Sequence, residues 1–118
     1  MMSLPKLPSS ILVLGEEFRV EVISDLHSGT DPVSGETVGA YLRIRINADL
    51  DLPRQWTTLI HEYVHAVLHV VGIGNILSEE VEEVIAQSME YGIVQLLRNQ
   101  GNQLRQVIKS IHTPEKVK

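Results

Sequence analysis

The sequence predicts an α+β domain in which a small N-terminal β-sheet is followed by helices. In the first half of the chain apolar and polar residues alternate, as they do along a half-buried strand. In the second half apolar residues recur every three or four positions, as they do on one face of a helix. Strands that come before helices, instead of alternating with them, are typical of the α+β class. A length of 118 residues fits one domain.

The predicted strands are residues 11–23 and residues 38–47. The first contains an apolar run, ILVL, then residues 15–17, which can form a turn, and then an alternating stretch, FRVEVI. The second, VGAYLRIRIN, places three aliphatic side chains on one face and a tyrosine and two arginines on the other. Residues 24–37 are rich in Ser, Gly, Asp and Pro and are predicted to form a loop. Residues 1–10, with two prolines and three serines, are predicted to be a flexible lead-in.

The second half of the chain predicts three helices. The first spans residues 54–71 and ends at a Gly-Ile-Gly-Asn turn. The second, residues 79–99, follows a serine N-cap and is expected to run antiparallel to the first. A shorter helix is predicted at residues 102–111. The domain is therefore expected to cover residues 11–112, with residues 113–118 as a charged tail.

Composition excludes several kinds of site. The chain has no cysteine, so disulfides, thiolate zinc sites and cysteine nucleophiles are excluded. The net charge of −5 argues against a general nucleic-acid binder, which usually carries a basic face. Glutamates interrupt the only apolar run near the N-terminus, which indicates neither a signal peptide nor a membrane span. We therefore expect a cytoplasmic protein.

The chemistry of the chain is concentrated in His61-Glu62-Tyr63-Val64-His65, an HExxH sequence within the first predicted helix. Residues four apart share a helix face, so His61 and His65 can bind one metal ion. Glu62 would then lie close enough to take a proton from a metal-bound water. A single histidine on an apolar helix more often packs or faces solvent, but three of the 5 histidines cluster here, which favours a metal site.

Catalytic zinc usually has three protein ligands, so a third is expected from another element. The acidic start of the second helix offers Glu79, Glu80, Glu82 and Glu83, and an antiparallel helix pair would bring Glu82 or Glu83 level with His65. His69 continues the four-residue series, but three residues at such spacing rarely converge on one ion because a straight helix turns away from it. His69 is therefore expected to support a ligand or face solvent.

The stretches TLIHEYVHAVLHVVGI and EEVEEVIAQSM, with RIRIN upstream, resemble the zincin metallopeptidases. They are most similar to small phage and prophage HExxH proteins and to ImmA/IrrE-like metallo-endopeptidases. The resemblance implies that a glutamate in an E-x-x-A context is the third ligand, which selects Glu83, whereas a helical wheel favours Glu82. It also implies that the strand before the helix, here residues 38–47, is an edge strand that pairs with the substrate.

These features predict a zinc-dependent metallopeptidase that holds Zn²⁺ on His61, His65 and Glu83 and hydrolyses peptide bonds with a water activated by Glu62. The expected partner is a peptide or protein substrate, with no nucleic acid and no membrane. One alternative is a catalytically silent phage or prophage accessory protein, or protein-binding module, that is stabilised by metal. Another is a metal-free interaction domain that uses the apolar stripe of residues 81–97. The long apolar second helix would also allow a homodimer.

Overall fold

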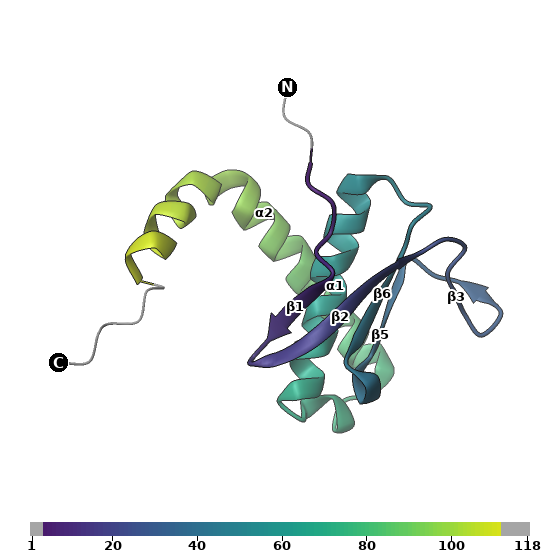
Figure 1. Ribbon diagram of the computed structural model, residues 1–118. Coiled ribbons are helices and arrows are strands. Elements are labelled where there is room, and N and C mark those ends of the chain that lie inside the picture. The colour runs from purple at the N-terminus through teal and green to yellow at the C-terminus, as the bar shows by residue number, and fades with distance from the viewer. Residues whose placement is uncertain (1–3, 112–118) are drawn as a thin grey trace.

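The computed structural model describes residues 4–111 and confirms the α+β class. One helix, α1, covers a four-stranded sheet, and a second helix, α2, packs against α1 and then extends away from the sheet (Figure 1). The elements in chain order are β1 (Ser10–Val13), β2 (Glu16–Ile23), β3 (His27–Ser28), β4 (Asp31–Pro32), β5 (Gly35–Val38), a 3₁₀ turn (Gly39–Tyr41), β6 (Arg43–Asn47), α1 (Leu52–Val70), a second 3₁₀ turn (Ile73–Asn75) and α2 (Glu79–Ile111).

The sheet has the order β1-β2-β6-β5, which places β5 at one edge. Strands β1 and β2 form an antiparallel hairpin, and Leu14 and Gly15 make its turn with positive φ angles of 51° and 89°. Strands β2 and β6 are parallel, with Val20 opposite Ile44. Strands β5 and β6 are antiparallel, with Thr37 opposite Ile44. The edge strand β5 contacts the HExxH segment through Thr37 and Glu62.

The prediction of one continuous strand over residues 38–47 was wrong. The chain reverses at residues 39–42 through the 3₁₀ turn and through Leu42, whose φ of 54° is left-handed. As a result β6 lies inside the sheet and β5 forms the edge. The prediction that residues 24–37 are a loop was also partly wrong, because they contain the β3–β4 ribbon and most of β5.

The core lies between the sheet and α1. The sheet contributes side chains that point toward the helix, and α1 contributes side chains that point toward the sheet. The sheet residues are Val13, Phe18, Val20, Ile44 and Ile46, and the helix residues are Leu59 and Ala66. Burying an aliphatic or aromatic side chain of this size contributes about 1.5–3 kcal/mol. This packing fixes the height and rotation of α1 above the sheet, and thereby the direction in which its polar residues point.

Both helices begin at side-chain caps. Asp51 accepts a hydrogen bond from the backbone N–H of Arg54 at 2.9 Å, and Ser78 accepts one from Val81 at 3.2 Å. After α1 the chain turns at Gly72, whose φ is 82°. The two helices predicted at residues 79–99 and 102–111 form one element, α2, which is interrupted by the non-helical backbone of Gln100. Within residues 4–111 no helix is long and apolar enough to cross a membrane.

The predicted division into lead-in, domain and tail stays a prediction, and residues 113–118 lie outside the described residues. Within the described part of the lead-in, Leu7 packs against the core. The carbonyl of Pro5 accepts a hydrogen bond from the Trp56 indole N–H at 2.8 Å. These contacts tie the start of the chain to α1.

Candidate metal centre

Helix α1 turns the two histidines of the HExxH sequence toward α2. Its apolar residues pack on the sheet, and His61 and His65, one turn apart, lie on the side that meets the second helix. Both side chains are largely covered, with exposed fractions of 14% and 17%. Their ring centroids are 5.1 Å apart. The imidazoles are therefore adjacent and shielded from most of the solvent, as a pair of metal ligands needs to be.

Helix α2 brings the carboxylate of Glu83 to both histidines. Its Oε2 lies 3.0 Å from Nε2 of His61, and its Oε1 lies 3.1 Å from Nε2 of His65. One ligand atom from each of these three residues falls within 4.8 Å of the other two. Ligand atoms of a tetrahedral zinc site are separated by about 3.3 Å, given bonds of about 2.0–2.1 Å. Two imidazole nitrogens and a carboxylate oxygen gathered in this way could hold a metal ion.

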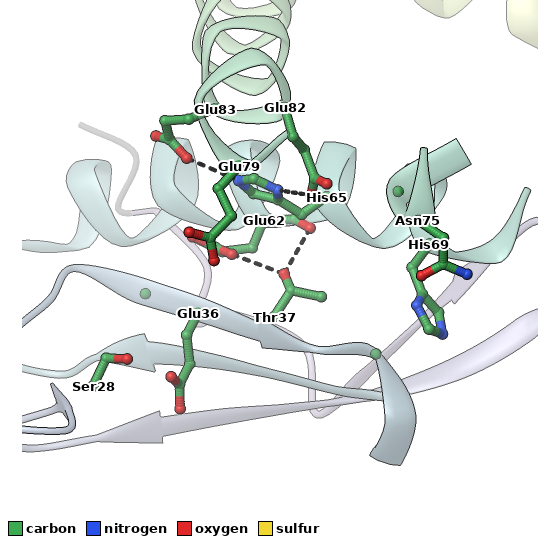
Figure 2. A pocket seen from close by; sticks show the side chains of 13 residues that line it. Ser28, Glu36, Thr37, Glu62, His65, His69, Asn75, Glu79, Glu82 and Glu83 are labelled. Atoms are coloured by element: carbon green, nitrogen blue, oxygen red, sulfur yellow. Dashed lines mark hydrogen bonds and ion pairs between the residues drawn. The ribbon is translucent and has the colours of Figure 1, made fainter. Parts of the chain in front are cut away.

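Two further carboxylates of α2 contact the opposite nitrogens of the same rings. Glu90 Oε1 lies 3.0 Å from Nδ1 of His61, and Glu82 Oε2 lies 2.5 Å from Nδ1 of His65. Figure 2 shows Glu82 and Glu83 on either side of the His65 ring. Glu82, the third ligand that the helical wheel favoured, thus contacts Nδ1 of His65, whereas Glu83 contacts Nε2 of the same ring.

The carboxylate of Glu62 is buried beside the histidines, with 6% of the residue exposed. The hydroxyl of Thr37, on β5, donates to its Oε1 at 2.8 Å and lies 3.0 Å from its backbone carbonyl oxygen (Figure 2). Burial raises the pKa of Glu62 above its usual 4.5, and this outweighs the hydrogen bond from Thr37 and the charges of His65 and His61, which lower it. The site therefore holds a carboxylate with increased proton affinity.

The pKa of His65 is also raised above its usual value. Burial alone would lower it, but the hydrogen bond to Glu82, the charge of Glu62 and the hydrogen bond to Glu83 together exceed that effect. In the absence of metal, the acidic surroundings thus favour a proton on this ring. A cation can take the place of that proton.

Two clefts adjoin the group of three residues, and Glu62 and Glu83 line both. The first, of about 480 Å³, opens on the side of His65 and is drawn in Figure 2. The second, of about 530 Å³, opens on the side of His61. Other residues that line the first are Glu36, Thr37, His69, Asn75 and Glu79, and others that line the second are Arg54, Thr58, Gln87 and Tyr91.

The remaining sequence candidates lie around this group. Glu79 lines the first cleft and makes no contact of hydrogen-bond length with either ligand histidine. His69 also lines that cleft, but its ring lies against Gly39 of the turn after β5, outside the group of three. Figure 2 shows it pointing away from His65. Sequence reasoning missed Thr37 and Glu90. Glu90 could have been found, because it follows Glu83 by seven residues and so shares its helix face.

Fold and site together define a metallopeptidase-like α+β domain built around an HExxH helix. Residues 15–96, well over half of the chain, match the Peptidase M78 family, described as the IrrE N-terminal-like domain. The chain belongs to this family, which confirms its resemblance to the ImmA/IrrE-like metallopeptidases. No curated protein and no solved structure matches the chain.

Proposed function

We propose that the protein is a zinc-dependent peptidase that hydrolyses peptide bonds in a peptide or protein substrate. The observation that carries the proposal is the convergence of His61, His65 and Glu83 beside the buried carboxylate of Glu62. Family membership supports a peptidase activity, and the two clefts give a substrate access from either side.

Zinc is the ion that this donor set favours. Two imidazole nitrogens and one carboxylate, with a fourth position left for water or substrate, are typical of catalytic zinc sites in peptidases. When bound, the ion polarises the scissile carbonyl and lowers the pKa of the attacking water. Calcium and magnesium prefer all-oxygen sites, which two histidines do not provide.

Glu62 is the group that moves the proton. Its carboxylate accepts a proton from the attacking water and then delivers it to the nitrogen of the leaving amine. The carboxylate is buried beside the candidate metal ligands, where it can keep the proton from bulk water between the two steps. Thr37 holds Oε1 by a hydrogen bond, which restricts the rotation of the carboxylate between the two clefts.

The edge strand β5 supports an extended substrate. It pairs with β6 on one side, and no other strand of residues 4–111 pairs with its second side. Its backbone N–H and C=O groups can therefore bind a peptide as an added strand. Gly35 of β5 lines both clefts together with Glu62, and Thr37 lines the first, so a peptide bound along β5 would pass the group of three residues.

The test is proteolysis by the purified full chain loaded with zinc, with an unfolded protein and a peptide library as substrates. We expect cleavage by the wild type and a loss of about 10²–10⁴-fold in Glu62→Gln, because the general base is removed. The variant should retain its zinc, because Glu62 is outside the group of three. Glu80→Gln removes the same charge from an exposed site and should cleave like the wild type.

A wild type that binds zinc but cleaves no substrate would contradict the peptidase proposal. That result would favour the second candidate, a metal-stabilised accessory or protein-binding module. Equal cleavage by the wild type and Glu62→Gln would instead exclude Glu62 as the base and indicate another catalytic group.

A further inference from the structure

Each candidate ligand histidine has both of its ring nitrogens occupied by carboxylates of α2. The Nε2 atoms of both rings face Glu83, at 3.0 Å and 3.1 Å. The Nδ1 atoms face two separate partners, Glu90 for His61 and Glu82 for His65. Both partners are mostly covered, with side-chain exposed fractions of 19% and 22%. The two Nδ1 contacts are not needed to hold a metal, so they require an explanation of their own.

The chemistry of the two groups fixes the direction of each hydrogen bond. An ionised carboxylate can only accept, so Nδ1 is the donor in each of these two contacts. With a metal ion bound at Nε2, Nδ1 keeps its hydrogen, and the hydrogen bond to the carboxylate orients the ring. Each Nδ1 contact thus selects the form of the ring that can bind a metal through Nε2, and it opposes the ring flip that would exchange the nitrogens.

The spacing along α2 explains how one helix serves both rings. Glu82, Ala86 and Glu90 are four residues apart and so share a face. Ala86 is fully buried and has a small side chain, which lets this face lie close to α1. Because the helices run in opposite directions, Glu90 meets His61 and Glu82 meets His65.

We propose that Glu82 and Glu90 are positioning residues of the metal centre. Each holds one ligand histidine with hydrogen on Nδ1 and with Nε2 directed at the carboxylate of Glu83. The inference rests on the proposed metal site. It also gives Glu82 a role other than that of a metal ligand. Glu82 contacts Nδ1 of His65, and this nitrogen points away from the metal that Nε2 of the same ring would bind.

The test measures zinc affinity by competition with a chromophoric chelator, using the metal-free full chain. We expect Glu82→Ala and Glu90→Ala to weaken zinc binding by about 10–100-fold each, the usual effect of removing such a partner. Glu82→Gln and Glu90→Gln should recover most of the affinity, because the amide oxygen can still accept from Nδ1. Glu80→Gln, with the same loss of charge at an exposed site of the helix, should bind like the wild type.

Two further measurements separate positioning from folding. Denaturant unfolding of each metal-free variant shows whether it folds. The visible absorption of the Co²⁺-loaded protein reports the geometry of the ligands, and it should change in the alanine variants and return toward wild type in the glutamine variants. A purely structural ion pair would lower the stability of the metal-free chain and leave the Co²⁺ spectrum unchanged.

The outcomes distinguish the inference from the proposed function. If the wild type binds no zinc, the proposed function fails and the positioning role fails with it. If the wild type binds zinc and both alanine variants bind it within twofold of the wild type, only the positioning role is overturned. Glutamine variants as weak as the alanine variants would also overturn it, because charge alone would then account for the effect.

Discussion

Thr37 of β5 and Glu62 of α1 are joined at two points: the threonine hydroxyl lies 2.8 Å from Oε1 of Glu62 and 3.0 Å from its backbone carbonyl oxygen. The single hydroxyl hydrogen can be donated to either oxygen, so one side chain of the edge strand contacts both the carboxylate and the backbone of the proposed base. The strand proposed to bind substrate and the group proposed to move the proton are therefore held in a fixed relation.

Replacement of Thr37 by valine tests this contact. Thr37→Val keeps the shape of the side chain but leaves the buried carboxylate without its donor. We expect the free energy of unfolding to fall by about 1.5–3 kcal/mol, the range for a hydrogen bond to a charged group. Peptidase activity should fall as well, while zinc is retained. Denaturant unfolding and a zinc assay measure these effects, and Thr37→Ser should restore both. A valine variant with wild-type stability and activity would show that the contact neither stabilises the fold nor supports catalysis.

The absence of a side chain at Gly35 allows β5 to approach α1. A Cβ atom placed there would lie 2.7 Å from Cγ2 of Thr58, 3.0 Å from the carbonyl oxygen of Arg45 and 3.2 Å from Cγ of Glu62. Gly35→Ala should therefore push the strand away from the base and destabilise the fold by about 1–3 kcal/mol, the usual cost of overpacking.

The matched control is Gly92 of α2, where an added Cβ meets nothing within 4 Å. Gly92→Ala should stabilise the protein by up to about 1 kcal/mol, because alanine is the better helix former. Thermal or denaturant unfolding compares the two variants directly. A Gly35→Ala variant as stable as Gly92→Ala would contradict the close approach of β5 and α1.

The pKa of His65 makes its contribution to stability depend on pH in the metal-free chain. The folded pKa lies above the ordinary 6.5, so the folded state holds the proton more tightly than the unfolded state does. The resulting stabilisation is complete below about pH 6.5 and is lost as the pH rises through the folded pKa. With a chelator present, the difference in free energy of unfolding between the wild type and His65→Ala should therefore decrease with rising pH. A difference that stays constant or grows would show that the pKa is not raised.

Much of the site follows from local rules that the sequence displays. The HExxH spacing places two histidines on one helix face because a helix has 3.6 residues per turn. The antiparallel return of α2 favoured Glu82 or Glu83, the E-x-x-A context implied by the family resemblance selected Glu83, and the structure places the Glu83 carboxylate between the two Nε2 atoms. The helical wheel favoured Glu82 because it took Val81, Ile85 and Met89 as the buried stripe. Val81 and Met89 are about half exposed, Ile85 is partly buried, and the fully buried residue of α2 is Ala86.

The features that the sequence concealed depend on contacts between distant residues. The reversal at residues 39–42 rests on a left-handed Leu42, a conformation that its residue type does not predict. Thr37 lies 25 positions before its partner Glu62, and Glu90 lies 29 positions after His61. The Thr37 contact is set by how β5 packs against α1, and no short-range pattern predicts it, whereas the seven-residue spacing from Glu83 places Glu90 on the same face of α2.

The central claim is that the three converging side chains bind a metal ion, and the metal content of the untagged protein tests it most directly. We expect about one zinc per chain, lost in the double variant His61→Ala, His65→Ala and retained in His69→Ala, whose ring lies outside the group. A wild type without bound metal, with a stability that the double variant leaves unchanged, would contradict both the metal site and the peptidase built on it.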